Sequence, residues 1–252
     1  MAVKKAEAGE LRIDALKRGR ITVRLIGETP FYFNAMSTKV KRDLLVGGGK
    51  KTTAEKRNIK HDPEREFRDS IYRMPDGPTL LGFPATAPKG AMATAALETP
   101  GVTKSSIRRL VFLPEHRIKI WGKPYLKMDV VRSADINRTP DIRTRAYLPR
   151  WCSEFDIAFV TPTLTTHSVV SLLVNGGIIA GLGDFRQEKG AGNFGTFSVV
   201  GDDLGEHADL WNELMREGRD VQQAAMDNAE PADDETAELM GILNAERVRR
   251  AA

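Results

Sequence analysis

The sequence predicts an α+β fold in which two helices lie on one face of a small antiparallel sheet. Apolar and polar residues alternate from Ile21 and from Trp151 onwards, which is the period of a half-buried strand. Two other segments, 86–97 and 165–180, favour helices by composition or by the spacing of their apolar residues. The order of elements is strand, basic segment, helix, strands, helix, glycine-rich loop and strand. This alternation is typical of an α+β sandwich.

The amino-terminal segment leads into the first strand. Residues 1–19 are polar and predict a short helix or an arm, whereas residues 21–36, ITVRLIGETPFYFNAM, predict a strand. Residues 37–73 are strongly basic and contain three consecutive glycines, 47–49. A charged segment punctuated by glycine predicts an exposed insertion after the first strand.

A helix and a strand-rich region follow the insertion. Thr86 is suited to cap a helix with Pro88 in its first turn, and Pro100 and Gly101 are suited to end it. The segments LVFLPEHRIKIWG and YLKMDVVRS, within residues 107–133, predict strands joined by basic loops. Residues 132–150 are rich in arginine, and we expect them to form a basic arm.

The clearest strand is WCSEFDIAFVTP, residues 151–162. Its alternation predicts that one face carries Trp151, Ser153, Phe155, Ile157 and Phe159. A helix starting at residue 165 or 166 follows, then a glycine-rich loop over 181–195 and a last strand, TFSVVG. The complete order predicts a ferredoxin-like sandwich whose second sheet face stays open, and proteins of this architecture often bind single-stranded nucleic acid on that face.

The last part of the chain, residues 205–252, predicts an acidic helical appendix to a core that spans residues 1–204. Leu210, Trp211, Leu214 and Val221 have helical spacing in HADLWNELMREGRDVQQAAM. A second helix is predicted after Pro231, with acidic residues in its first turn and arginines in its last. We expect these helices to dock on the body of the protein or on a neighbour.

The formal net charge of +4 hides an asymmetry along the chain of 252 residues. Residues 1–200 contain 33 lysines and arginines against 20 acidic residues, while residues 201–252 contain 5 against 14. A basic body with an acidic tail is typical of a protein whose body binds a polyanion such as nucleic acid.

Composition excludes several classes of protein. The single cysteine, Cys152, excludes a disulfide scaffold and a cysteine-based zinc cluster and indicates a reducing compartment. Its place inside a strand pattern predicts a buried, inert thiol. No apolar segment approaches the length of a membrane span, and the charged start lacks the apolar stretch of a signal peptide. We therefore expect a soluble, cytoplasmic protein with no membrane partner.

Two motifs that suggest nucleotide chemistry lack required residues. In GGGKKT, Leu44 stands where a P-loop needs its first glycine and Lys51 where it needs Ser or Thr. In GLGDFR, Arg186 stands where the dinucleotide fingerprint needs its third glycine. The four histidines are far apart and lack carboxylates at metal-ligand spacing. The sequence contains no catalytic constellation, so we expect a binding protein without a cofactor or a metal rather than an enzyme.

Two segments together resemble the RAMP superfamily, the ferredoxin-like RNA-binding proteins of CRISPR effector complexes. LGFPATAPKGAMATAA, residues 81–96, is similar to the family's stretch from an apolar strand to an alanine-rich helix, with Lys89 and Gly90 as its Lys-Gly pair. GLGDFRQEKGAGNFGTF, residues 181–197, resembles the family's carboxy-terminal glycine-rich loop. The basic insertion matches backbone-type subunits. Across the whole chain there is also a similarity to proteins of tailed phages, which suggests a phage-encoded relative.

The resemblance implies a non-enzymatic subunit that oligomerises along a guide-like single-stranded RNA in a ribonucleoprotein. Glycines allow close approach to a sugar-phosphate backbone, cations neutralise phosphates and aromatic rings stack on bases. On these grounds the insertion would act as a thumb and the arm would grip the strand from the other side. The residues predicted to bind nucleic acid are Lys39, Lys41, Arg42, Lys50, Lys51, Lys56, Lys89, Arg132, Arg138, Arg143, Arg145, Phe185, Arg186, Lys189, Gly190 and Gly192.

Other functions stay open at this point. The same surface would serve a phage single-stranded DNA-binding or annealing protein, since only the 2′-hydroxyl distinguishes the two strands chemically. The chain is also consistent with a structural or regulatory module whose basic arms contact other proteins. A metal-dependent nuclease is a further alternative. For the loop itself, the simpler interpretation is a glycine-rich connection that packs at the edge of the sheet.

Overall fold

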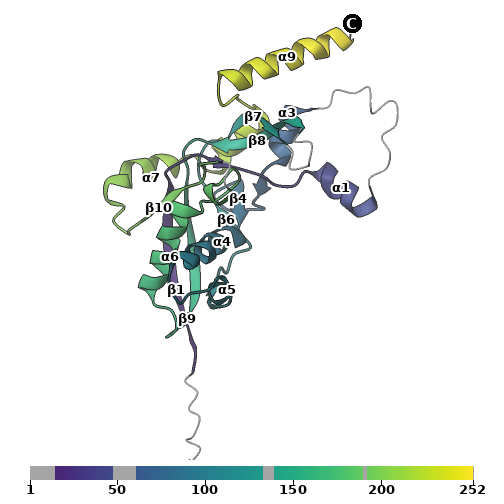
Figure 1. Ribbon diagram of the computed structural model, residues 1–252. Helices are drawn as coiled ribbons and strands as arrows, with labels where there is room; N and C mark the ends of the chain where they lie inside the picture. Colours follow the sequence, from purple (N-terminus) through teal and green to yellow (C-terminus); the bar gives the residue numbers. More distant parts are fainter. Residues whose placement is uncertain (1–14, 48–60, 133–138, 190–191, 252) are drawn as a thin grey trace, which may run out of the picture.

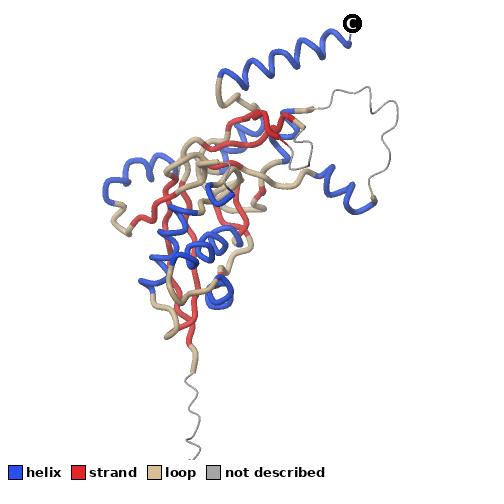
Figure 2. Tube along the Cα trace, viewed as in Figure 1, coloured by secondary structure: helices blue, strands red, loops and turns tan. Residues whose placement is uncertain are grey.

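The computed structural model describes residues 15–47, 61–132, 139–189 and 192–251 (Figure 1). Over these residues the protein has an α+β fold, because helices pack against three small antiparallel sheets. The tube in Figure 2 shows the strands gathered in the body of the molecule, while helices lie around them and project from it.

The largest sheet has the strand order β10-β1-β9-β5, and all neighbouring strands are antiparallel. Its strands are β1 (Lys17–Gly27), β5 (Val111–Phe112), β9 (Cys152–Thr161) and β10 (Phe197–Val200). Val23 pairs with Phe155 and Ile21 with Ile157, so the apolar residues of β1 and β9 share one face. The predicted face of β9 is confirmed, because Ser153, Phe155, Ile157 and Phe159 are buried, as is Trp151 just before the strand.

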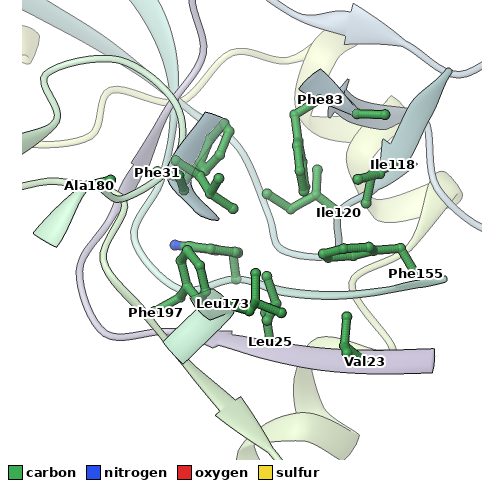
Figure 3. Close-up of a cluster of buried hydrophobic side chains, with 14 of the residues drawn as sticks. Val23, Leu25, Phe31, Phe83, Ile118, Ile120, Phe155, Leu173, Ala180 and Phe197 are labelled. Atoms are coloured by element: carbon green, nitrogen blue, oxygen red, sulfur yellow. The ribbon is translucent and has the colours of Figure 1, made fainter. Parts of the chain in front are cut away.

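Two helices cover this apolar face, α4 (Thr86–Ala95) and α6 (Thr166–Ile179). The start of α6 follows the prediction, because the Thr165 hydroxyl accepts a hydrogen bond from the Ser168 amide at 3.1 Å. A side chain at Gly176 would touch Ala91 of α4, and one at Gly177 would lie 2.2 Å from the Phe197 carbonyl oxygen. These glycines therefore let α6 approach α4 and β10 closely. Figure 3 draws part of the buried cluster, in which Leu173 of α6 lies with Val23 and Leu25 of β1 among side chains from other elements.

Two three-stranded sheets complete the body, with the strand orders β2-β8-β7 and β3-β4-β6. Their strands are β2 (Phe31–Tyr32), β3 (Tyr72–Arg73), β4 (Leu81–Pro84), β6 (Arg117–Lys119), β7 (Tyr125–Arg132) and β8 (Pro140–Leu148). The structure differs here from the basic arm expected over 132–150, since residues 140–148 form a strand paired with β7. Three residues at the centre of β8, 144–146, are buried.

The described part of the basic insertion, residues 37–47 and 61–73, contains two helices of different character. Helix α1 (Thr38–Val46) projects away from the body (Figure 1). Its side chains at Leu44, Leu45 and Val46 are exposed. Helix α3 (Pro63–Asp69) belongs to the body, because Phe67 is fully buried in the core and α3 packs on β7 and β8. The expected exposure is thus found over α1, whereas the part of the segment that forms α3 belongs to the core.

Short helices connect the remaining elements. They are η1 (Ala96–Glu98), α5 (Lys104–Leu110), η2 (Gln187–Lys189) and η3 (Gly205–His207). None of the helices in the described ranges is long and apolar enough to cross a membrane.

The carboxy-terminal appendix consists of α7 (Ala208–Leu214), α8 (Arg219–Asp227) and α9 (Asp234–Ala251). Trp211 and Leu214 of α7 pack on Trp121 and Cys152, so this helix docks on the chain's own body. Helix α9 begins against β7, where the Met128 amide donates to the Thr236 hydroxyl at 3.3 Å, and its far end extends away from the sheets (Figure 1).

Candidate nucleic-acid-binding cleft

A cleft of about 520 Å³ lies between α4, α5 and the loop that follows α6. Its floor includes Phe31, Tyr72 and Phe83 from the three-stranded sheets. The segments 81–96 and 181–197, which are far apart in the sequence, both line it. We call this feature the α4–loop cleft, and its polar lining includes Thr86, Thr94, Lys104, Arg108, Asp184, Arg186 and Glu188.

The α4 wall is smooth because small residues recur on one helix face. Thr86, Gly90 and Thr94 are spaced four residues apart and all line the cleft. A Cβ atom added to Gly90 would have no heavy atom within 4 Å, so this glycine borders open space. The absence of a side chain at Gly90 therefore leaves room for a ligand beside the first turns of α4.

The opposite wall is the glycine-rich loop, which is tied to β2 and to its own far end. The Asp184 amide donates to the Tyr32 carbonyl at 3.0 Å, and the Leu182 amide donates to the Gly195 carbonyl at 2.8 Å. Gly183 has φ +84°, a backbone conformation that L side chains rarely adopt. This glycine is required by the turn itself.

Gly192 also serves the packing of the loop. A Cβ atom there would lie 1.8 Å from the carbonyl oxygen of Phe185, within the same loop. The close approach permitted by this glycine is thus to the protein's own backbone, which differs from the predicted approach to a sugar-phosphate chain. Gly190, the other glycine predicted to bind, lies outside the described residues.

Arg145 is buried, with only 3% of its surface exposed, although we expected it on an exposed arm. Its guanidinium donates to Asp184 at 2.6 Å and to Asp129 at 3.4 Å, and lies 4.0 Å from the Phe185 ring centroid. Burial lowers the pKa of Arg145, while the two carboxylates oppose this shift. The physical reason for the difference is that carboxylates and an aromatic ring from distant segments compensate the buried charge. Arg145 therefore anchors the glycine-rich loop to β8 through Asp184 and Phe185.

The cations at the mouth of the cleft differ in their partners. Glu188 accepts a hydrogen bond from the Thr94 hydroxyl at 2.7 Å and lies 3.5 Å from Arg186 and 3.9 Å from Lys104. Arg108 is exposed and makes no ion pair with any residue in the described ranges. Its guanidinium is consequently available to an anion that enters the cleft.

The sequence-predicted residues fall into three groups. Arg186 lines the cleft, and Phe185 supports its wall. Lys89 lies on α4 outside the cleft, while Lys41 and Arg42 on α1 and Arg132 and Arg143 near the β7–β8 connection are exposed elsewhere. Outside the described residues lie Lys50, Lys51, Lys56, Arg138 and Gly190, and the side chains of Lys39 and Lys189 are not described.

Sequence reasoning missed Lys104 and Arg108. The sequence analysis predicts strands from residue 107 onwards and no element over 104–106. Thr103 is nevertheless an N-cap signal, and its hydroxyl accepts a hydrogen bond from the Ser106 amide at 3.1 Å. A helix over 104–110 would have placed both cations, which are four residues apart, on one face.

The centre of the open face of the large sheet carries charges that neutralise one another. Arg20 pairs with Asp156, and Arg24 donates to Glu154 at 2.7 Å. The Thr22 hydroxyl donates to Asp156 at 2.6 Å. Because its central cations already have carboxylate partners, this face is a weaker candidate for binding a polyanion than the cleft.

No protein-family model matches the chain, and no match is found among curated proteins. Within the described ranges, no three His, Cys, Asp or Glu side chains are grouped so as to hold a metal ion. Cys152 is buried, and burial raises the pKa of its thiol to about 12, as expected for an inert cysteine.

Proposed function

We propose that β1, α4, β5, β9, α6 and β10 form a ferredoxin-like unit. In chain order these elements give strand, helix, strand, strand, helix and strand, which is the succession of that fold. The first and third of these strands are neighbours in the middle of the sheet, and the other two lie at its edges. The insertion, the two smaller sheets and the carboxy-terminal helices would then be additions to this unit.

We further propose that the chain is a non-enzymatic protein that binds single-stranded RNA in the α4–loop cleft. One observation carries the proposal. The two segments on which the resemblance to RNA-binding proteins rests, 81–96 and 181–197, both line this cleft. Such a meeting of distant segments is what a shared binding surface requires.

The chemistry of the cleft supports binding of a sugar-phosphate backbone. Arg108 has no anionic partner in the described part of the chain, and Arg186 and Lys104 share the single carboxylate of Glu188. The Thr86 hydroxyl and the open space at Gly90 suit a sugar-phosphate chain that runs along α4. Binding would therefore depend on phosphate neutralisation and would be largely independent of sequence. The preference for RNA rests on the resemblance, as does assembly of several copies along one strand.

Filling the cleft tests this function directly. Gly90→Phe introduces a ring into open space without a backbone clash, and we expect the affinity for a fluorescein-labelled oligouridylate to fall about tenfold or more. Gly241→Phe is the matched control, because Gly241 is also helical, lies on α9 and would have no heavy atom within 4 Å of an added Cβ atom. Equal affinity of the two variants in fluorescence anisotropy would exclude the cleft as the binding site.

Charge removal gives a second, independent readout. Arg108→Ala should reduce the slope of log affinity against log salt by about 0.7, the value for one phosphate contact with a single strand. Arg109→Ala, on the same helix but outside the cleft lining, is the control and should leave the slope unchanged. Parallel titrations with oligothymidylate decide between RNA and DNA, and DNA preference would favour the phage single-stranded DNA-binding function instead.

A further inference from the structure

Phe112 is an exposed aromatic residue at the edge of the large sheet. It ends β5, an edge strand, and pairs with Ala158 of β9. Its neighbour Val111 is fully buried on the helix-covered face, so the Phe112 ring lies on the opposite, open face. The residue is 36% exposed, which leaves part of the ring accessible to a planar ligand.

Two cations from different elements lie over this ring. The Arg18 guanidinium carbon of β1 is 5.4 Å from the ring centroid, and the Lys89 ammonium of α4 is 5.5 Å from it. Neither cation makes an ion pair with another described residue, in contrast to Arg20 and Arg24 on the same sheet. An aromatic ring beside two cations that have no carboxylate partner among the described residues combines a stacking surface with two phosphate-binding groups.

This cluster adjoins lining residues of the α4–loop cleft along the chain. Helix α5 carries Arg108 at the cleft and runs directly into β5, so Phe112 lies four residues after Arg108 in the chain. Lys89 precedes Gly90, which lines the cleft from α4. Residues next to one another in the sequence thus border the cleft and the Phe112 ring.

We propose that Phe112 stacks on one nucleobase of the strand, while Arg18 and Lys89 bind the phosphates on either side. This inference rests on the proposed function of the cleft and extends its binding site around the edge of the sheet. Stacking of a base on an aromatic ring is stronger than an exposed cation–π contact. The base consequently displaces a cation from the ring, and the displaced cation pairs with a phosphate.

The test compares oligouridylates of about 4 to about 16 nucleotides, the usual range of site sizes for single-strand binding surfaces. Phe112→Leu keeps an apolar side chain but removes the stacking surface, and we expect about a tenfold loss of affinity for the long strands only. Phe112→Trp should restore it. In strands with 2-aminopurine at successive positions, quenching of one position should occur with the wild-type chain and disappear in Phe112→Leu.

Tyr125→Leu is the matched control, because Lys123 lies 5.0 Å from the Tyr125 ring centroid in a comparable cation–π pair. This variant should bind strands of every length as the wild-type chain does. If Phe112→Leu also matches the wild-type chain at every length, the Phe112 site is wrong and the cleft proposal stands. If the wild-type chain binds no strand at all, the proposed function itself is overturned.

Discussion

The side chain of Gln222 connects the acidic appendix to the core, and its removal should destabilise the whole fold. Gln222 lies on α8 and is fully buried. Its Oε1 accepts hydrogen bonds from the amides of Leu80 at 2.8 Å and Leu81 at 3.0 Å. Its Nε2 donates to the carbonyls of Ile120 at 2.9 Å and Gly122 at 3.2 Å. One side chain thus satisfies four backbone groups of the body.

The cost of Gln222→Ala follows from these four contacts. A buried donor without an acceptor costs about 1–3 kcal/mol, so the amides of Leu80 and Leu81 together cost about 2–6 kcal/mol. Losing the hydrogen bond from Gln222 costs the carbonyl oxygens of Ile120 and Gly122 less free energy, because a carbonyl oxygen often keeps a second partner. A mid-range value of about 4 kcal/mol lowers the melting temperature of a chain of this size by about 10 °C. A loss of about 4 kcal/mol is a large part of the usual free energy of unfolding of a protein domain.

Urea unfolding followed by circular dichroism measures this effect. Gln223→Ala is the matched control, since the neighbouring Gln223 bonds only to Asp227 on the same helix and should change stability by less than about 0.5 kcal/mol. If Gln222→Ala is as stable as Gln223→Ala, α8 is not docked as described. A single, cooperative transition for the whole chain would accompany the expected result.

Three further predictions concern two glycines, an ion pair and the thiol. Gly90→Ala should raise the free energy of unfolding by about 1 kcal/mol, because it adds a helix former in open space. Gly192→Ala should lower the free energy of unfolding by about 1–3 kcal/mol, because its Cβ atom clashes with Phe185. Thermal melts that rank the two variants the other way round would contradict this. Burial acts in the opposite direction, but hydrogen bonds from Lys127 and Thr236 lower the pKa of Asp233 to about 2, below the usual value of about 3.9. Asp233 therefore stabilises the fold above about pH 4 and loses this effect as the pH falls towards about 2. Asp233→Asn should remove this pH dependence. An unchanged acid-unfolding profile would argue against the ion pair of Asp233 with Lys127. Cys152 should react with a thiol reagent only at the rate of unfolding, and immediate labelling of the native chain would show that it is accessible.

Local patterns in the sequence predicted the elements whose burial follows their own periodicity. Alternation over β9 identified its buried face, from Trp151 to Phe159, and Thr165 marked the start of α6. Burial of Cys152 followed from its place in a strand pattern. These predictions succeeded because an apolar face or an N-cap depends on residues only a few positions apart.

The candidate site depended on contacts between distant segments. The composition of 140–148 favoured an exposed arm, yet Arg145 is buried because Asp129 and Asp184 approach it from β7 and from the loop after α6. A glycine pattern likewise does not reveal whether the close neighbour is a ligand or, as at Gly192, the chain's own Phe185 carbonyl. Residue types and spacing therefore determined the charge asymmetry of this protein and those elements, such as β9 and α6, that have a clear period or an N-cap. Which cations remain free was decided only by the tertiary structure, because a charge is neutralised by whatever carboxylate the fold brings within a few ångströms of it.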